Sequence, residues 1–229
     1  MADKTEDRRR FLLGLAGSAA AVVAAPLAAA APAAATGFDP ARLAGALEGF
    51  SASLIREHLA LYETLRRRLQ ALDQAEARLD LAEADAGTGR LRAHQAEWLE
   101  CRNALVLHQS YFGALTPRSV TPPPALEAAL RRAFGSLDRW WVHLRATALA
   151  ARAWAALVWD PAGGGLRNVG TDDDRQWPAT AAPLLVVDLH EHAWVLDYLG
   201  RPEAYLAAWR KRVDWNVVAA RLEAARGGA

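Results

Sequence analysis

The sequence predicts an α+β protein in which an N-terminal antiparallel helical hairpin precedes an α/β domain with a three-stranded antiparallel sheet. Two long stretches with apolar residues at helical spacing, separated by a glycine-containing breaker, predict the hairpin. Short runs rich in β-branched and aromatic residues in the second half of the chain predict the sheet. With 229 residues, 52% of them hydrophobic, the chain can form one large domain or two small ones.

The hairpin is expected within residues 37–118. Its first helix is predicted from Pro40 to about Ala84, followed by the breaker Ala86–Gly89 and a second helix from about Leu91 to Ala114. Two long helices joined by a short link predict an antiparallel pair. In the first helix the residues at spacings of three and four are Leu43, Leu47, Phe50, Leu54, His58, Leu61, Leu65, Leu69 and Leu72.

The α/β domain is expected within residues 119–229, after a proline-rich junction. Trp154–Asp160 and Leu166–Gly170, joined by a glycine-rich turn, predict a β-hairpin, and Pro183–Asp188 predicts a third strand. Helices are predicted around these strands, at about Ala125–Phe134, Ser136–Ala151, Pro202–Arg212 and Asp214–Ala225.

The N-terminus is typical of a targeting segment. A basic stretch, Arg8–Arg10, precedes Phe11, Leu12 and an alanine-rich apolar run, which predicts a signal peptide over residues 1–35. The consecutive arginines resemble the twin-arginine export signal, so we expect a periplasmic or otherwise exported protein. A membrane anchor or an amphipathic N-terminal helix is the alternative. Pro26 and Pro32 interrupt the apolar run and disfavour a lasting membrane anchor.

The charge balance argues against nucleic-acid binding. The chain has 27 basic and 26 acidic residues, and residues 1–35 hold four basic and three acidic ones. The remaining 23 of each sign leave no basic excess, whereas nucleic-acid-binding domains carry one. Cys101 is the only cysteine, which excludes an intrachain disulfide.

Four residues are candidate metal ligands. Asp188 and His192 are four residues apart at the end of the third predicted strand, so a helical turn there would aim both side chains at one point. His58 and His108 each lie on the apolar side of one hairpin helix. A single histidine on an apolar face is more often a core residue than a ligand. Taken together, three imidazoles and one carboxylate suit iron, manganese or zinc.

The same residues carry a family resemblance. Asp188, two residues, then Glu191, His192, Ala193 and an aromatic residue, Trp194, resemble the closing motif of the iron/manganese superoxide dismutases. The likeness continues through Leu196-Asp197-Tyr198, Arg201-Pro202, Tyr205-Leu206 and Val213-Asp214-Trp215, and extends back over most of the chain.

This resemblance implies a function and a set of partners. It implies one iron or manganese ion per chain, held between the two domains by His58, His108, Asp188 and His192, and the conversion of superoxide to dioxygen and hydrogen peroxide. It also implies a homodimer in which Glu191 reaches the ligand histidine of the partner chain. Trp154 matches a family tryptophan that lines the pocket.

The sequence departs from the family where substrate entry and proton supply are decided. The family has a tyrosine eight residues after its first ligand, where this chain has Arg66. Tyr62, one turn earlier on the same helix side, is the candidate substitute, although packing is an equally plausible role. Arg66 could attract an anion electrostatically, but an arginine beside other arginines on a solvated helix face is the commoner case.

A second departure concerns the glutamine that bonds the metal-bound solvent in the family. It is expected at Ala104 or in the loop before the third strand, where Asp173 or Asp174 aligns better than Gln176. Because such residues set the redox potential, a dismutase-like metal-binding protein without turnover is the alternative function.

Two further family positions differ near the closing motif. Val195 replaces a tyrosine that joins the dimer bridge. His190 replaces a tryptophan that walls the site; it could contact the ligands from outside, but packing is its ordinary role.

Overall fold

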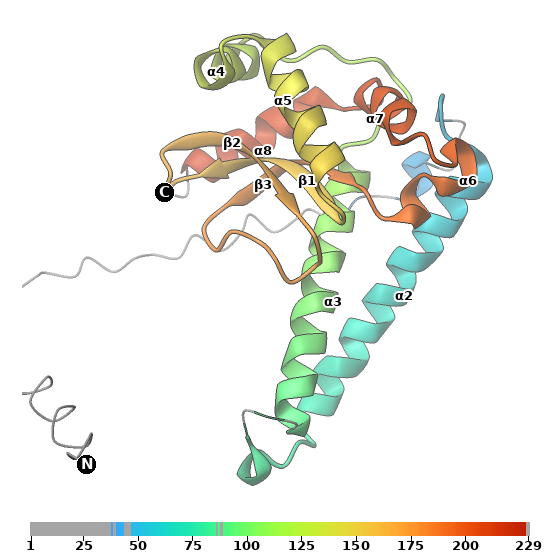
Figure 1. Cartoon of the computed structure of the whole chain (residues 1–229), viewed down its shortest axis with the longest axis vertical. Helices are drawn as coiled ribbons and strands as arrows, with labels where there is room; N and C mark the ends of the chain where they lie inside the picture. Colours follow the sequence, from blue (N-terminus) through green and yellow to red (C-terminus); the bar gives the residue numbers. More distant parts are fainter. Residues whose placement is uncertain (1–37, 39, 44–46, 86, 88, 228–229) are drawn as a thin grey trace, which may run out of the picture.

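The structure, a computed structural model, describes residues 38–227 except 39, 44–46, 86 and 88. The expected signal peptide lies outside the described residues. Two long helices, α2 (Ala52–Glu76) and α3 (Arg90–Gly113), run side by side and project from an α/β domain (Figure 1). The predicted α+β class, with a helical hairpin before the sheet, is confirmed. In the described part of the chain, no helix combines the length and apolarity needed to cross a bilayer.

The predicted start of the first helix at Pro40 is wrong. A short 3-10 helix, η1 (Pro40–Leu43), comes first, and α2 begins only at Ala52. Between them Gly49 has a φ of +90°, which is outside the helical region, and Leu47 forms a bridge with Phe50. Ser51 then caps α2, because its hydroxyl accepts a hydrogen bond from the Leu54 N–H at 3.1 Å.

The end of the first helix also differs from the prediction. α2 ends at Glu76, and a separate 3-10 helix, η2 (Leu81–Glu83), follows. Asp80 starts η2, since its carboxylate accepts from the Ala82 N–H at 2.9 Å. This local side-chain bond satisfies the Ala82 N–H without a continuous helix, so α2 can end before this point. The apolar periodicity, which continues past Glu76, therefore predicted a first helix that is too long.

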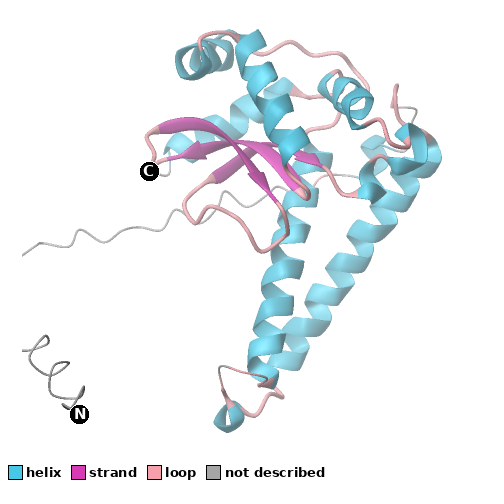
Figure 2. Ribbon diagram, in the orientation of Figure 1, coloured by secondary structure: helices cyan, strands magenta, loops and turns pink. Residues whose placement is uncertain are grey.

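The sheet matches the prediction closely. Strands β1 (Trp154–Asp160), β2 (Gly165–Thr171) and β3 (Ala182–Asp188) are antiparallel in the order β2-β1-β3 (Figure 2). Trp154 to Val158 of β1 are all buried, so both faces of the central strand are covered. Trp154 pairs with Asp188, which places the last residue of β3 beside the first residue of β1.

Helices pack around the sheet and complete the α/β domain. α4 (Pro124–Phe134) and α5 (Leu137–Ala150) pack against β2, and α5 also contacts β1. α3 and the last helix pack against β3. The chain leaves β3 through the remaining elements, η3 (Glu191–Ala193), α6 (Val195–Tyr198), α7 (Pro202–Arg210) and α8 (Trp215–Gly227).

The hairpin and the α/β domain are joined by hydrogen bonds on both sides of the β3 end. Arg221 on α8 donates through Nη1 to the carbonyls of Ser110 on α3 and Leu184 on β3, at 3.1 and 3.0 Å. Asp197 on α6 accepts from the backbone N–H of Ser51 at 2.6 Å, just before α2. These contacts fix both hairpin helices relative to Asp188.

Candidate metal centre

Four residues from four elements meet where the hairpin faces the end of β3. His58 comes from α2, His108 from α3, Asp188 from the last position of β3 and His192 from η3. One ligand atom of each lies within 4.8 Å of the others. The structure therefore brings together the four residues that the sequence proposed as metal ligands.

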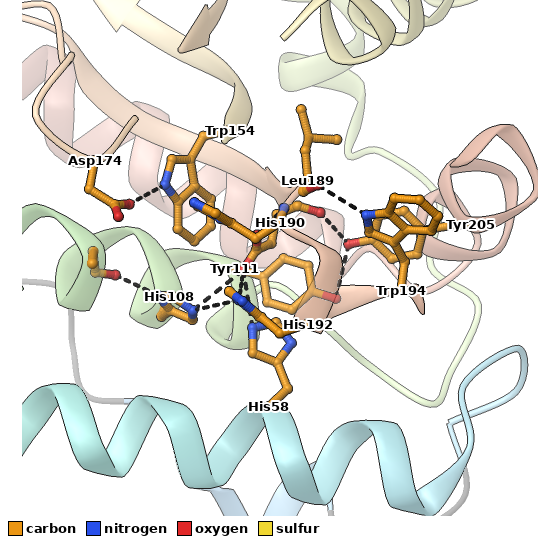
Figure 3. A network of polar contacts seen from close by, with 12 residues as sticks. His58, His108, Tyr111, Trp154, Asp174, Leu189, His190, His192, Trp194 and Tyr205 are labelled. Atoms are coloured by element: carbon orange, nitrogen blue, oxygen red, sulfur yellow. Dashed lines mark hydrogen bonds and ion pairs between the residues drawn. The ribbon is translucent and has the colours of Figure 1, made fainter. Parts of the chain in front are cut away.

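The three imidazoles, labelled in Figure 3, lie around a single carboxylate oxygen of Asp188. The Nε2 atoms of His58, His108 and His192 lie 3.1, 3.4 and 3.0 Å from Asp188 Oδ2. The Nε2 atoms of His108 and His192 are 3.4 Å apart. This is the arrangement of one carboxylate and three imidazoles around a common point.

The backbone of α3 fixes the tautomer of His108. Its Nδ1 lies 2.7 Å from the carbonyl oxygen of Ala104, one turn earlier. Because a carbonyl only accepts hydrogen bonds, Nδ1 carries the proton and the lone pair of Nε2 is free to bind a metal.

Asp188 is held from several directions. Its Oδ1 accepts from the backbone N–H of His190 at 2.9 Å and lies 2.8 Å from the ring Nδ1 of His190. Its backbone carbonyl accepts from the Tyr205 hydroxyl at 2.8 Å. With Oδ1 occupied in this way, Oδ2 is the oxygen turned toward the three imidazoles. Of the two roles that the sequence left open for His190, the structure shows contact with a ligand.

Burial and hydrogen bonding keep His58, His108 and Asp188 in the protonation states that a metal requires. Burial lowers the pKa of His58, and it lowers the pKa of His108 from 6.5 to about 4. Burial alone would raise the pKa of Asp188, but hydrogen bonds from His190, His192 and His58 hold it well below its usual value. At neutral pH the buried centre therefore presents an ionised carboxylate and neutral His58 and His108 imidazoles, which are the metal-binding forms.

Comparison with known proteins agrees with this geometry. The family described as "Iron/manganese superoxide dismutases, C-terminal domain" matches residues 122–221. An iron superoxide dismutase of Cupriavidus metallidurans is 32% identical over 193 residues, which cover 82% of this chain and 94% of that protein. The chain belongs to the iron/manganese superoxide dismutase family.

Other members of the family have similar sequence identities to this chain. The iron superoxide dismutase of Aquifex pyrophilus is 33% identical over 189 residues, which cover 78% of this chain and 87% of that protein. A manganese/iron superoxide dismutase of Propionibacterium freudenreichii is 33% identical over 127 residues, 53% of this chain and 63% of that protein. Relatives of both metal types are therefore similar to this chain.

The loop before β3 contains three consecutive aspartates, Asp172–Asp174, and is called the acidic loop below. Of these, Asp174 contacts Trp154, the tryptophan beside the ligands of this superoxide dismutase site. Its Oδ1 accepts from Trp154 Nε1 at 2.6 Å, and burial raises the pKa of its carboxyl group. The Trp154 ring packs edge-on against His108, with centroids 4.9 Å apart. Asp173 and Gln176, the other residues considered from the sequence, hydrogen-bond within the loop instead.

Tyr62 lies on the same side of α2 as His58 and is buried. Its hydroxyl accepts a hydrogen bond from Gln109 Nε2 at 3.1 Å, and its ring contacts Phe112, which packs against His58. Gln109 was not among the residues proposed from the sequence. The available signal was its position directly after the ligand His108.

Arg66 and Glu191 lie outside the cluster. Arg66 is exposed, and its Nε donates to Glu63 at 2.9 Å. Glu191 is exposed on η3, and its carboxylate makes no hydrogen bond or ion pair to another described residue. His94 and His143, which the sequence reasoning left out of the ligand set, also lie outside the four-residue group.

Proposed function

We propose that this protein is an iron- or manganese-dependent superoxide dismutase that converts superoxide to dioxygen and hydrogen peroxide. One observation carries the proposal. Three imidazole nitrogens and a carboxylate oxygen lie within 4.8 Å of one another in a chain that matches 94% of an iron superoxide dismutase. The donor set also fits the metal, since imidazole and carboxylate ligands suit iron and manganese.

The ligands would be Nε2 of His58, His108 and His192 and Oδ2 of Asp188, for one ion per chain. A bound ion supplies a one-electron couple between its +3 and +2 states, so that one superoxide loses an electron and a second gains it together with two protons. The protein supplies the surroundings. His58, His108 and Asp188 are at most 2% exposed, so these three ligands are shielded from bulk water.

The His192 side chain is 32% exposed in the single chain, so it is the least covered of the four ligands.

Tyr62 is the stronger candidate for proton delivery near the hairpin ligands. Because the Gln109 amide donates to the Tyr62 oxygen, the tyrosine keeps its own O–H proton for donation to another group. Arg66 is the weaker candidate for a role at the site. Its charge is offset by Glu63, and its side chain is 60% exposed.

The alternative is a family member that binds metal without turnover. Arg66 in place of the expected tyrosine, together with Ala104 and either Asp173 or Asp174 at the two expected glutamine positions, favours this alternative. The two functions are separated by measuring metal content and dismutase activity on one sample of the purified protein. The proposal requires stoichiometric iron or manganese and catalytic dismutation. Full metal occupancy without activity would support the alternative.

We also propose a homodimer built around Glu191. Glu191 is exposed beside the partly exposed ligand His192, and the following segment exposes Leu196 and Leu199. A second copy would cover these side chains and give the Glu191 carboxylate an imidazole partner. Sedimentation should give a dimer for the wild type and a weaker one for Glu191→Gln, with the exposed Glu223→Gln as control. A monomeric wild type would contradict this assembly.

For cellular location we propose export by the twin-arginine route, supported by Arg8–Arg10 and the apolar run that follows. Exchanging Arg8→Lys and Arg9→Lys together should leave the precursor in the cytoplasm, because the route recognises the arginine pair. Normal appearance of processed protein outside the cytoplasm would contradict the assignment.

A further inference from the structure

His190 makes two hydrogen bonds to one oxygen of a proposed metal ligand. Its backbone N–H and its ring Nδ1 lie 2.9 and 2.8 Å from Asp188 Oδ1. An ionised carboxylate only accepts hydrogen bonds, so the ring nitrogen facing it carries a proton. Any residue at this position could supply the backbone donor. The histidine ring adds a second donor that depends on the side chain.

The ring is held in the orientation that this bond requires. It stacks on the ring of His192, with centroids 5.1 Å apart and an interplanar angle of 11°. It also meets the Trp154 ring edge-on, with centroids 5.2 Å apart (Figure 3). The side chain is only 28% exposed. These contacts restrict rotation, so Nδ1 stays directed at the carboxylate.

The two oxygens of Asp188 consequently have different roles. Oδ1 accepts from His190, whereas Oδ2 lies within 3.4 Å of the three ligand imidazoles. Donation to Oδ1 fixes the rotation of the carboxylate about its Cβ–Cγ bond. It also withdraws electron density from the carboxylate, which makes Oδ2 a weaker donor to a cation. A weaker anionic donor stabilises a trivalent ion less than it would otherwise.

We propose that His190 is a positioning residue that aims Asp188 Oδ2 at the metal and raises the reduction potential of the bound ion. The inference rests on the proposed metal centre. It adds a role for a residue that differs from the family, because the family resemblance places a tryptophan at position 190. The ring N–H of a tryptophan lies farther out on a larger side chain than the Nδ1–H of histidine. His190 contacts no substrate; it acts through Asp188.

The test compares His190→Leu with His190→Asn in the full chain loaded with iron. Leucine removes the ring donor but keeps the backbone N–H, whereas an asparagine amide can place an N–H where the imidazole Nδ1–H lies. We expect His190→Leu to change the ratio of ferric to ferrous affinity by about tenfold in favour of the ferric ion. For one electron this lowers the midpoint potential by about 59 mV.

His190→Asn should restore most of the wild-type potential in a spectroelectrochemical titration. An unchanged potential in His190→Leu, or an equal shift in both variants, would overturn the inference. Thermal unfolding of all three proteins checks that the variants fold.

A second readout keeps this test separate from the proposed function. If the wild type takes up neither iron nor manganese, the proposed function fails, and cobalt(II) binding then decides the positioning role. Loss of the bond also frees the carboxylate to rotate away from the metal, and loss of such an orienting bond typically costs 10-fold or more in metal affinity, which for a divalent ion exceeds the gain in donor strength of Oδ2. We therefore expect cobalt(II) to bind His190→Leu about tenfold more weakly than the wild type, and His190→Asn to bind it nearly as well as the wild type. Equal affinities in all three would overturn the inference.

Discussion

The two halves of the metal centre hold their ligands in different ways. On the hairpin side, His58 and His108 are buried on long helices, and within the described part of the chain the one hydrogen bond that supports them from outside the cluster is the bond of His108 to its own helix. On the α/β side, Asp188 ends a strand, and His190 and Tyr205 bond its Oδ1 and its carbonyl. The difference shows that a ligand can be oriented by packing on a rigid helix or by a network of hydrogen-bond donors. The hairpin side and the α/β side should therefore respond differently to substitution.

The largest effect is expected on the α/β side. In Asp188→Ala the hydrogen-bond donors of His58, His190 and His192 lose their acceptor, and the only anionic member of the four-residue group is lost. We expect no stoichiometric metal, and a fall of about 3 kcal/mol in the unfolding free energy of the metal-free protein. Urea denaturation measures the second effect.

The matched control for this substitution is Asp172→Ala, which removes an exposed carboxylate of the loop before β3. It should change the unfolding free energy by less than about 0.5 kcal/mol. Equal losses in the two variants would show that the network around Asp188 does not stabilise the fold.

On the hairpin side, the burial of His108 predicts a pH dependence. In the metal-free protein its pKa is about 4, against 6.5 for an ordinary histidine. Between these values the unfolded chain binds a proton that the folded chain does not, so the unfolding free energy falls as the pH decreases. The loss over this window is about 3 kcal/mol and ends once the folded state is also protonated.

Urea denaturation of the metal-free protein at several pH values between roughly 7 and 4 measures this slope. His58, whose pKa burial also lowers, contributes in the same direction. His108→Gln, which cannot titrate there, should give a shallower dependence. An identical slope in wild type and variant would mean that His108 is not the group responsible.

A smaller effect is expected from a residue beside the hairpin ligands. Tyr62→Phe keeps the ring against Phe112 but removes the hydroxyl that accepts from Gln109. Dismutation should slow by about tenfold or more, because a proton donor is lost, while the metal content stays unchanged. Arg66→Ala, the control on the next turn of α2, should change the rate little. If Tyr62→Phe is as active as the wild type, protons enter through Arg66 or the acidic loop instead.

The sequence predicted most of the fold and all four members of the cluster, for identifiable reasons. The hairpin and the strands follow from local periodicity, which is why β1 has the predicted bounds. Asp188 and His192 are four residues apart, and the place of His58 and His108 on the two hairpin helices, together with the family resemblance, indicated the other two ligands. The start of α2 was misjudged because Gly49 and Ser51 interrupt an apolar pattern that continues on both sides of them.

What the sequence could not predict depends on contacts between distant segments or on side-chain rotation. The bond between Gln109 and Tyr62 joins different helices, and the bond between Asp174 and Trp154 joins a loop to a strand. His190 is near Asp188 in sequence, but only the turn after β3 shows that its ring points back to the carboxylate rather than into the core. These residues surround the four ligands, so they affect the properties of the metal centre more than its ability to form.

The central claim is that one metal ion is held jointly by the two halves of the molecule. Elemental analysis of His108→Ala beside His143→Ala, both purified and loaded in the same way, tests it most directly. His143 is an exposed histidine on α5, outside the four-residue group. We predict close to one iron or manganese ion per chain in the wild type and in His143→Ala, and a large loss of metal in His108→Ala. Full occupancy in His108→Ala would contradict the account, because the hairpin would then contribute no essential ligand through α3.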